Sequence, residues 1–117
     1  KFVRPCHEAH AQHLLGGPSV GPGSDELRAG ELSLSRPRLD ERTYDNLWKA
    51  AIRARPDMVT ITSFNEWGEG TQIEPAAAQH GYRSYNGAWG LHGIAAPTAY
   101  LTRTAYWTGR FHSLSAP

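Results

Sequence analysis

Two glutamates in a glycine-rich segment are the residues of this sequence whose spacing best suits chemistry. Glu66 and Glu69 lie three positions apart in the segment NEWGEG, residues 65–70. In a continuing strand they would point to opposite faces, but Gly68 and Gly70 allow the backbone to turn, so the two carboxyl groups can share a pocket. Hydrolysis of a glycosidic bond needs such a pair. Paired glutamates in a glycine-rich loop also cap helices or form ion pairs, and the spacing alone leaves both interpretations open.

Aromatic side chains near this pair suit contacts with sugar rings. Trp67 can desolvate a neighbouring carboxyl group or stack on a sugar face. The candidate substrate-binding residues are Asn65, Trp67, Tyr82, Tyr85 and Trp89. For the three aromatic residues of the later loop, packing of that loop onto the protein is an equally open role. Glu74 lies further from the pair, and we expect a structural role for it.

The elements that must position these residues are a helix and the strand that follows it. Tyr44 to Ala54 has apolar residues at helical spacing, with Thr43 as the expected N-cap and Pro56 as the stop. Met58 to Phe64 is short, β-branched and almost uncharged, which is typical of a strand covered on both faces. Together they predict one step of a parallel α/β fold. Active sites of (β/α)8 barrels lie at the carboxyl ends of such strands.

The alternation along this strand predicts which way Glu66 points. Glu66 shares a face with Phe64, Thr62 and Thr60, and it would point inward at the barrel mouth. Val59 and Ile61 point the other way, where they would pack under the outer helices.

The rest of the chain predicts less regular structure. We expect a short helix from Cys6 to Leu15. From Gly16 to Gly23 we expect a loop around a very short strand. We interpret Ser24 to Arg42 as an exposed connection, and Glu66 to about Ala96 as a long irregular segment. A last helix is expected from Pro97 to Phe111, and the expected frayed tail comprises residues 113–117.

Composition and charge exclude several classes of function. The 117 residues include 12 basic and 11 acidic ones, for a net charge of +1. No charge block would neutralise a phosphate backbone, so nucleic acid is not an expected partner. No apolar run approaches the roughly 18 residues that span a bilayer. Cys6 is the single cysteine, which excludes an internal disulfide and leaves the cellular compartment unknown.

A cluster near the N-terminus suggests metal binding, but its spacing argues against it. Cys6, His7, His10 and His13 include histidines on one helical face. His7-Glu8-Ala9-His10 is one residue short of the HExxH zinc motif. We therefore predict no metal site and no cofactor.

Residues 60–76, TITSFNEWGEGTQIEPA, closely resemble the signature ITSFNEWHEGTQIE of family 99 glycoside hydrolases, the endo-α-mannosidase group. The segment PSVGPG, residues 18–23, also resembles that family, with Asp25 and Arg28 at matching offsets. Tyr100 and Leu101 in the final aromatic helix resemble its last barrel helix. The resemblance extends from about Pro18 to Phe111.

The resemblance implies a retaining, metal-independent (β/α)8-barrel enzyme that cleaves within α-mannosidic chains. By the same resemblance, Glu66 engages the sugar 2-hydroxyl, which attacks the anomeric carbon and gives an anhydrosugar. Glu69 takes the role of general acid and then of base. Three features depart from the family pattern: Gly68 replaces a histidine, Ser24 replaces an aromatic residue, and the loop Gly81 to Gly93 differs from that of animal endomannosidases.

Length and fold class together predict a fragment. A complete barrel needs about 250 residues, so residues 1–117 are expected to be the C-terminal part of one α/β glycoside hydrolase barrel, inactive alone on its oligosaccharide or polysaccharide substrate. Residues 1–17 lack the family pattern, and their fold is left open. The alternatives are a non-catalytic carbohydrate-binding module and a barrel protein of polysaccharide biosynthesis.

Overall fold

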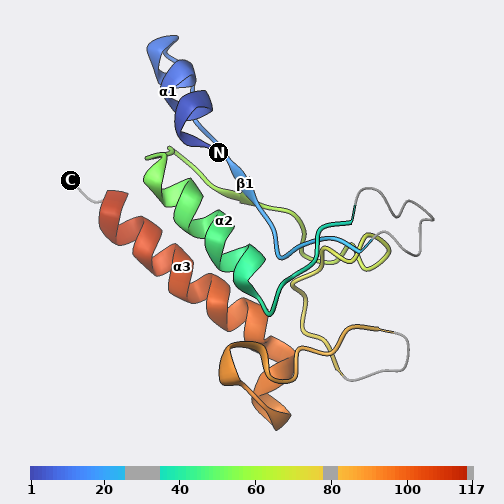
Figure 1. Cartoon of the computed structure of the whole chain (residues 1–117). Coiled ribbons are helices and arrows are strands. Elements are labelled where there is room, and N and C mark those ends of the chain that lie inside the picture. The colour runs from blue at the N-terminus through green and yellow to red at the C-terminus, as the bar shows by residue number, and fades with distance from the viewer. Residues whose placement is uncertain (26–34, 78–81, 116–117) are drawn as a thin grey trace.

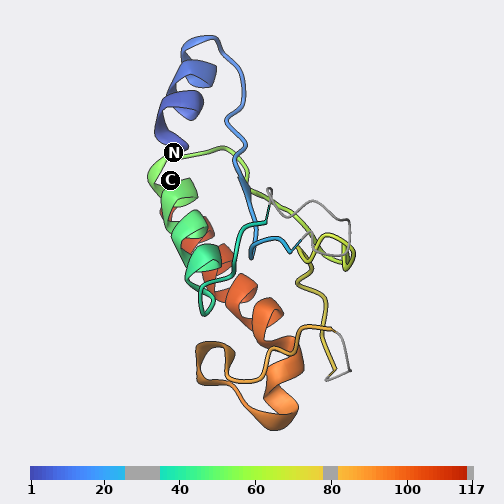
Figure 2. The ribbon, with the colours of Figure 1, turned by 45° about the vertical axis from the view of Figure 1, so that its right-hand side comes forward.

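The computed structural model of this protein describes residues 1–25, 35–77 and 82–115. Its elements are α1 (Val3–Ala11), β1 (Ser19–Val20), α2 (Arg42–Arg53), β2 (Thr60–Ile61), the 3-10 helices η3 (Ala88–Gly90) and η4 (Gly93–Thr98), and α3 (Ala99–Ser115). Figure 1 shows α2 and α3 side by side on one side of β1, with α1 beyond one end of α2. The molecule is 48 Å long and 19 Å thick. It therefore has the form of a slab with two helices along one face (Figure 2).

The two strands pair in parallel, and α2 connects them. Ser19 pairs with Thr60 and Val20 pairs with Ile61. A Cβ atom at Gly21 would lie 2.4 Å from the carbonyl oxygen of Thr62, so only glycine permits this close approach of the two chains. The predicted helix, turn and strand of a parallel α/β fold, and the very short strand within residues 16–23, are confirmed.

The second strand is shorter and more exposed than the sequence predicts. Residues 58–64 were expected to form a strand covered on both faces, but only Thr60–Ile61 is a strand. Met58 is 49% exposed and Phe64 is 52% exposed. That part of the prediction is wrong for this chain, because β1 is the only strand that pairs with β2 among the described residues. A strand of a barrel wall needs a neighbour on each side to extend its ladder and cover its inner face.

The predicted alternation of β2 is present. Val59 and Ile61 pack against the core cluster beneath the helices. Thr60 is exposed, as are Thr62, Phe64 and Glu66 beyond the strand. In a closed barrel the side opposite to the helices is the interior, and the inward orientation of Glu66, which follows the end of β2, stays a prediction.

Helix α2 contributes the centre of the core. Tyr44, Trp48 and Ala51 are buried, and Leu47 and Ile52 are partly buried against the same cluster, so the predicted apolar face is confirmed. The helix begins two residues earlier than expected. Its N-cap is Glu41 in a left-handed conformation, and not Thr43, whose hydroxyl donates to the carbonyl oxygen of Pro37 at 2.6 Å.

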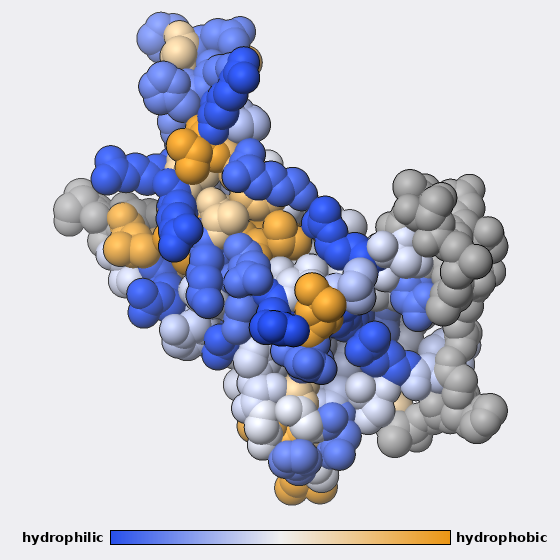
Figure 3. Space-filling view, viewed as in Figure 1, coloured by the Kyte–Doolittle hydropathy of each residue, from blue (hydrophilic) through white to orange (hydrophobic). Residues whose placement is uncertain are grey.

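Helix α1 begins and ends earlier than the predicted range of residues 6–15. Pro5 lies in its first turn, where the missing N–H has no helical partner to lose. His13 adopts a φ of 58°, and the amide of Leu14 donates to the carbonyl oxygen of Ala9 at 2.9 Å. A left-handed residue with this hydrogen bond is a typical helix C-terminus, so the helix ends at Ala11. Exposed apolar surface lies near the junction of α1 with the other elements (Figure 3).

Helix α3 starts and finishes later than expected. The 3-10 helix η4 contains Pro97, and α3 itself covers Ala99–Ser115. Residues 113–115, predicted to be a frayed tail, are therefore helical, and residues 116–117 lie outside the described part. Tyr100 and Trp107 are buried on the predicted inner face, whereas Ala105 is exposed.

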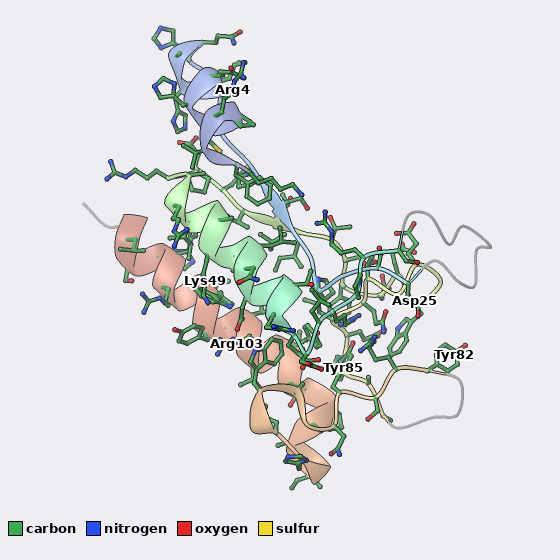
Figure 4. All side chains as sticks on the ribbon, viewed as in Figure 1. Arg4, Asp25, Lys49, Tyr82, Tyr85 and Arg103 are labelled. Carbon is green, nitrogen blue, oxygen red and sulfur yellow. The ribbon has the colours of Figure 1, made fainter. Side chains whose placement is uncertain are left out.

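Asp45 joins α2 to α3 through several hydrogen bonds. Arg103 donates to its two oxygens at 2.7 and 2.6 Å, and the indole N–H groups of Trp107 and Trp89 donate at 2.7 and 3.1 Å. Figure 4 shows Arg103 on α3. Partial burial alone would raise the pKa of the Asp45 carboxyl group, but the hydrogen bonds outweigh it and lower the pKa below its ordinary value.

The lowered pKa of Asp45 predicts a contribution to acid denaturation. The folded state then holds this proton less tightly than the unfolded state, so the stabilisation is present above the unfolded pKa of about 3.9 and is lost as pH falls through the folded pKa. We expect the free energy of unfolding to fall less steeply for Asp45→Asn than for the wild type between about pH 5 and pH 2. Urea titrations across this range measure it, and equal slopes would contradict the assignment.

Candidate active site

The segment with the two glutamates forms a closed loop at the end of β2. The hydroxyl groups of Ser63 and Thr71 lie 2.6 Å apart, and the Ser63 amide donates to the carbonyl oxygen of Thr71 at 3.0 Å. The amide of Glu66 donates to the Ser63 hydroxyl at 3.1 Å, and the amide of Thr71 donates to the carbonyl oxygen of Glu66 at 3.3 Å. Glu66 and Glu69 therefore lie on one short turn whose two ends are tied together, and both side chains are exposed.

The two glycines of this turn have different roles. Gly70 has a φ of 65°, and its amide donates to the carbonyl oxygen of Trp67 at 3.2 Å, which closes the turn. A Cβ atom at Gly70 would lie 2.8 Å from the backbone nitrogen and the Cβ of Asp25. A Cβ atom at Gly68 would have no described atom within 4 Å. Gly70 is thus required by the backbone, whereas Gly68 has room for a side chain.

This difference predicts opposite results for a matched pair of substitutions. Gly70→Ala is expected to lower the free energy of unfolding by about 1–3 kcal/mol, because it combines a left-handed conformation with a steric clash. Gly68→Ala is expected to leave stability unchanged or to raise it by up to about 1 kcal/mol. Chemical denaturation of both variants measures the difference. Equal losses for the two would show that the turn is not held as the structure describes.

Trp67, which is partly buried, and Tyr82, which is 44% exposed, form an aromatic pair beside the turn. The Trp67 indole N–H donates to Glu74 Oε2 at 2.7 Å, which gives Glu74 the expected structural role of fixing the ring. The Tyr82 ring lies edge-on to it with the centroids 5.6 Å apart. These rings, with Pro75 and Ala77, line an open groove of about 490 Å³.

Tyr85 and Trp89, two of the candidate sugar-binding residues, make packing contacts. Tyr85 is only 2% exposed, and its hydroxyl donates to the carbonyl oxygen of Gln72 at 3.0 Å. The partly buried Trp89 donates to Asp45 and meets Tyr100 edge-on at 4.8 Å. In Figure 4 Tyr85 lies near the helices, whereas Tyr82 lies on the far loop side. The burial of Tyr85 and the contacts of Trp89 favour the packing role that the sequence left open for them, and their sugar-binding role stays a prediction. Asn65 is exposed, and its role stays a prediction.

Arg38 beside this turn was missed by the sequence analysis. Residues 24–42 were interpreted as an exposed connection, but Arg38 is 3% exposed and donates to the carbonyl oxygens of Gly70 and Gln72. That interpretation is wrong for Arg38, and residues 26–34, which include Arg28, lie outside the described part. Nothing in the local sequence marks one arginine of this polar run as buried.

The N-terminal histidine cluster takes part in a different arrangement. His10 Nε2 lies 2.7 Å from Asp57 Oδ2, and the same oxygen accepts the amide of Gly16 at 2.7 Å. In residues 1–25, 35–77 and 82–115, no three His, Cys, Asp or Glu side chains are placed to hold one metal ion. Within those same ranges, no helix is long and apolar enough to cross a membrane.

The fold and the site together define a class. Parallel strands joined through a helix are part of the wall of an α/β barrel, and the turn at the carboxyl end of β2 lies at the edge where such barrels carry their active sites. The chain belongs to glycosyl hydrolase family 99, whose family model matches residues 6–113.

Relatives and solved structures agree with this membership. The chain is 36% identical over 108 residues to a glycoprotein endo-alpha-1,2-mannosidase of Xenopus laevis. The match covers 87% of this chain and 22% of that protein. It is 46% identical over 68 residues to a human glycoprotein endo-alpha-1,2-mannosidase-like protein, covering 56% of this chain and 15% of the relative. The structure of the family 99 endo-alpha-mannosidase from Bacteroides thetaiotaomicron matches with a TM-score of 0.82 at 36% identity, over 99% of this chain and 34% of that one.

These matches confirm the fold class and the family. The chain has the α/β fold of part of a (β/α)8 barrel. It spans 22% and 15% of the length of the two curated relatives named above and 34% of the solved structure.

Proposed function

We propose that this chain carries the catalytic carboxylates of a retaining glycoside hydrolase that acts on α-mannosidic or related glycans. The observation that supports it most is the position of Glu66 and Glu69 on one tied turn, at the carboxyl end of β2, where both side chains are exposed. In this class of fold that position is where catalytic side chains lie.

The proposed reaction proceeds through the sugar 2-hydroxyl. Glu66 accepts the proton of the 2-hydroxyl group while the oxygen of that hydroxyl attacks the anomeric carbon. Glu69 protonates the departing glycosidic oxygen. The product of this step is a 1,2-anhydrosugar. Glu69 then removes a proton from a water molecule, whose oxygen attacks the anomeric carbon and opens the three-membered anhydro ring. Glu66 returns the first proton to the 2-oxygen of the sugar. The configuration at the anomeric carbon is inverted in each of the two steps, so it is retained overall.

Two properties of the chain fit this route. In a manno-configured sugar the axial 2-hydroxyl can reach the side of the anomeric carbon opposite to an axial leaving group. Glu66 and Glu69 are both exposed on their turn, so each can reach a substrate. The aromatic pair of Trp67 and Tyr82, with Asn65, is proposed to contact neighbouring sugars, since aromatic faces pack well on the C–H faces of sugar rings.

The proposed activity belongs to a complete barrel and not to these 117 residues alone. The inner side of β2 is exposed here, with Phe64 52% accessible. The substrate site of a (β/α)8 enzyme is assembled from loops that follow all eight strands, in a domain of about 250 residues. We therefore infer that the isolated chain does not turn over glycans.

A hybrid enzyme tests the proposal. In the hybrid, this chain replaces the matching third of the Bacteroides thetaiotaomicron endo-alpha-mannosidase. We expect turnover of a fluorogenic α-linked mannose oligosaccharide by the hybrid and none by the 117-residue chain. Turnover by the isolated chain would contradict the inferred incompleteness. A folded hybrid that binds the oligosaccharide without turnover would contradict catalysis and favour the carbohydrate-binding alternative.

A further inference from the structure

Arg38 is a buried cation that contacts the backbone of the active-site turn. It precedes α2, and only 3% of its surface is exposed. Its Nη2 donates to the carbonyl oxygen of Gly70 at 3.0 Å and to that of Gln72 at 2.8 Å. Gly70 follows Glu69 directly in the chain, and Gln72 lies two residues further on, where the turn leaves the site.

The guanidinium group is fixed by the core on its other sides. It lies 4.6 Å from the ring centroid of Tyr100 and 5.6 Å from that of Tyr85. The Tyr85 hydroxyl donates to the same Gln72 carbonyl oxygen that Arg38 contacts. The Arg38 carbonyl oxygen accepts the amide of Thr43 at 3.1 Å, in the first turn of α2. Arg38 therefore connects the start of α2 and the first turn of α3 to the turn that carries Glu69.

Fold stability alone is a poor explanation for an arginine at this position. Its Nε and Nη1 atoms are buried without an acceptor at hydrogen-bonding geometry in the described residues. Buried donors without partners are costly, and a buried charge is costlier still. An apolar side chain would fill the space between the two tyrosine rings, but it could not donate to the two carbonyl oxygens.

Arg38 is one of several attachments of the turn, and it holds two carbonyl groups on the C-terminal side of Glu69. Ser63 and Thr71 close its base, and the amide of Asp25 donates to the Glu69 carbonyl oxygen at 2.8 Å. Without Arg38, the Gly70 carbonyl would lose its side-chain donor, and Gln72 would keep only that of Tyr85. The backbone hydrogen bonds of Thr71 and Ile73 would remain, so the carbonyl groups of Gly70 and Gln72 are the part of this backbone that loses support.

We propose that Arg38 is a positioning residue, which holds the Gly70–Gln72 backbone so that Glu69 keeps its place relative to Glu66. This inference rests on the proposed function of that pair. Displacement of a catalytic group by about 1 Å can cost roughly 100-fold in rate. Arg38 then acts on turnover through Glu69 and does not itself contact the substrate.

The first test measures the turn itself in the 117-residue chain. Arg103→Met is the matched control, because Arg103 also stacks on aromatic rings and makes hydrogen bonds, but to Asp45 on α2. We expect Arg38→Met and Arg38→Lys to speed amide hydrogen exchange at Gly70 and Thr71 by about tenfold or more, beyond any change at α2 amides. The control variant Arg103→Met should speed amide exchange throughout the chain and not at the turn in particular. Unchanged exchange at Gly70 and Thr71 in Arg38→Met, which has no donor, would overturn the proposal.

The second test measures catalysis in the hybrid. Arg38→Met is expected to lower kcat about 100-fold with KM changed less than about threefold. Arg38→Lys should lie between it and the unchanged hybrid, because an ammonium group lacks the planar fork of the guanidinium group. Arg103→Met should keep kcat per folded molecule. A kcat loss no larger than that of the control would overturn positioning, whereas an inactive unchanged hybrid would contradict only the proposed function and leave the exchange test decisive.

Discussion

Glu69→Gln is expected to lower turnover of an α-linked mannose oligosaccharide by the hybrid about 10²- to 10⁴-fold. The amide has nearly the same shape as the carboxyl group, but it can neither protonate the glycosidic oxygen nor accept a proton from water. Steady-state kinetics on a substrate with a sugar leaving group measures the loss. KM should change little, because the altered interaction belongs to the transition state.

A matched control and a second substrate make this experiment specific. Glu74→Gln changes the same functional group five residues further on, where it accepts the Trp67 indole N–H and has no proposed role in proton transfer. A departing fluoride ion needs little protonation, so the loss on Glu69→Gln should be much smaller in the first step with an α-mannosyl fluoride. Glu66→Gln should slow both substrates, because the 2-hydroxyl must be activated whichever group departs. Equal losses for Glu69→Gln and Glu74→Gln would contradict the assigned acid.

The regular elements of the chain could be predicted because one local signal fixes each of them. The apolar residues of α2 recur at helical spacing, and Tyr44, Trp48 and Ala51 are buried as expected. Alternation along the strand correctly separated Val59 and Ile61, which pack against the core, from the exposed Thr60. These patterns depend on neighbours in sequence, which a single chain displays.

The features that could not be predicted depend on contacts between distant segments. Tyr82 and Tyr85 are three residues apart in one loop, yet one is 44% exposed beside Trp67 and the other is 2% exposed. The burial of Tyr85 results from Arg38 and Tyr100, which belong to segments far away in the chain. The length of β2 likewise depends on which strands pair with it and not on the β-branched residues of its own sequence.

The largest effect on stability is expected at Trp48, because the core of the wall is centred on it. Its side chain is 1% exposed and lies parallel to Trp107 of α3, with centroids 6.4 Å apart and an interplanar angle of 7°. Trp48→Ala should lower the free energy of unfolding by about 3–5 kcal/mol through lost burial and a cavity. A domain of this size has a total stability of roughly 5–15 kcal/mol, so the variant should be largely unfolded under mild conditions. Urea denaturation followed by circular dichroism measures this loss.

Two further variants separate the core from the site. Trp48→Phe should cost less than Trp48→Ala, since it keeps an aromatic ring and removes an indole N–H that is buried without a described acceptor. Tyr82→Ala removes an aromatic ring of the proposed sugar groove, where 44% of the side chain is exposed, so stability should change by less than about 1 kcal/mol. In the hybrid, the same variant should raise KM. If Tyr82→Ala destabilised the chain as much as Trp48→Ala, the Trp67–Tyr82 pair would belong to the core, and the proposed sugar contact would lose its support.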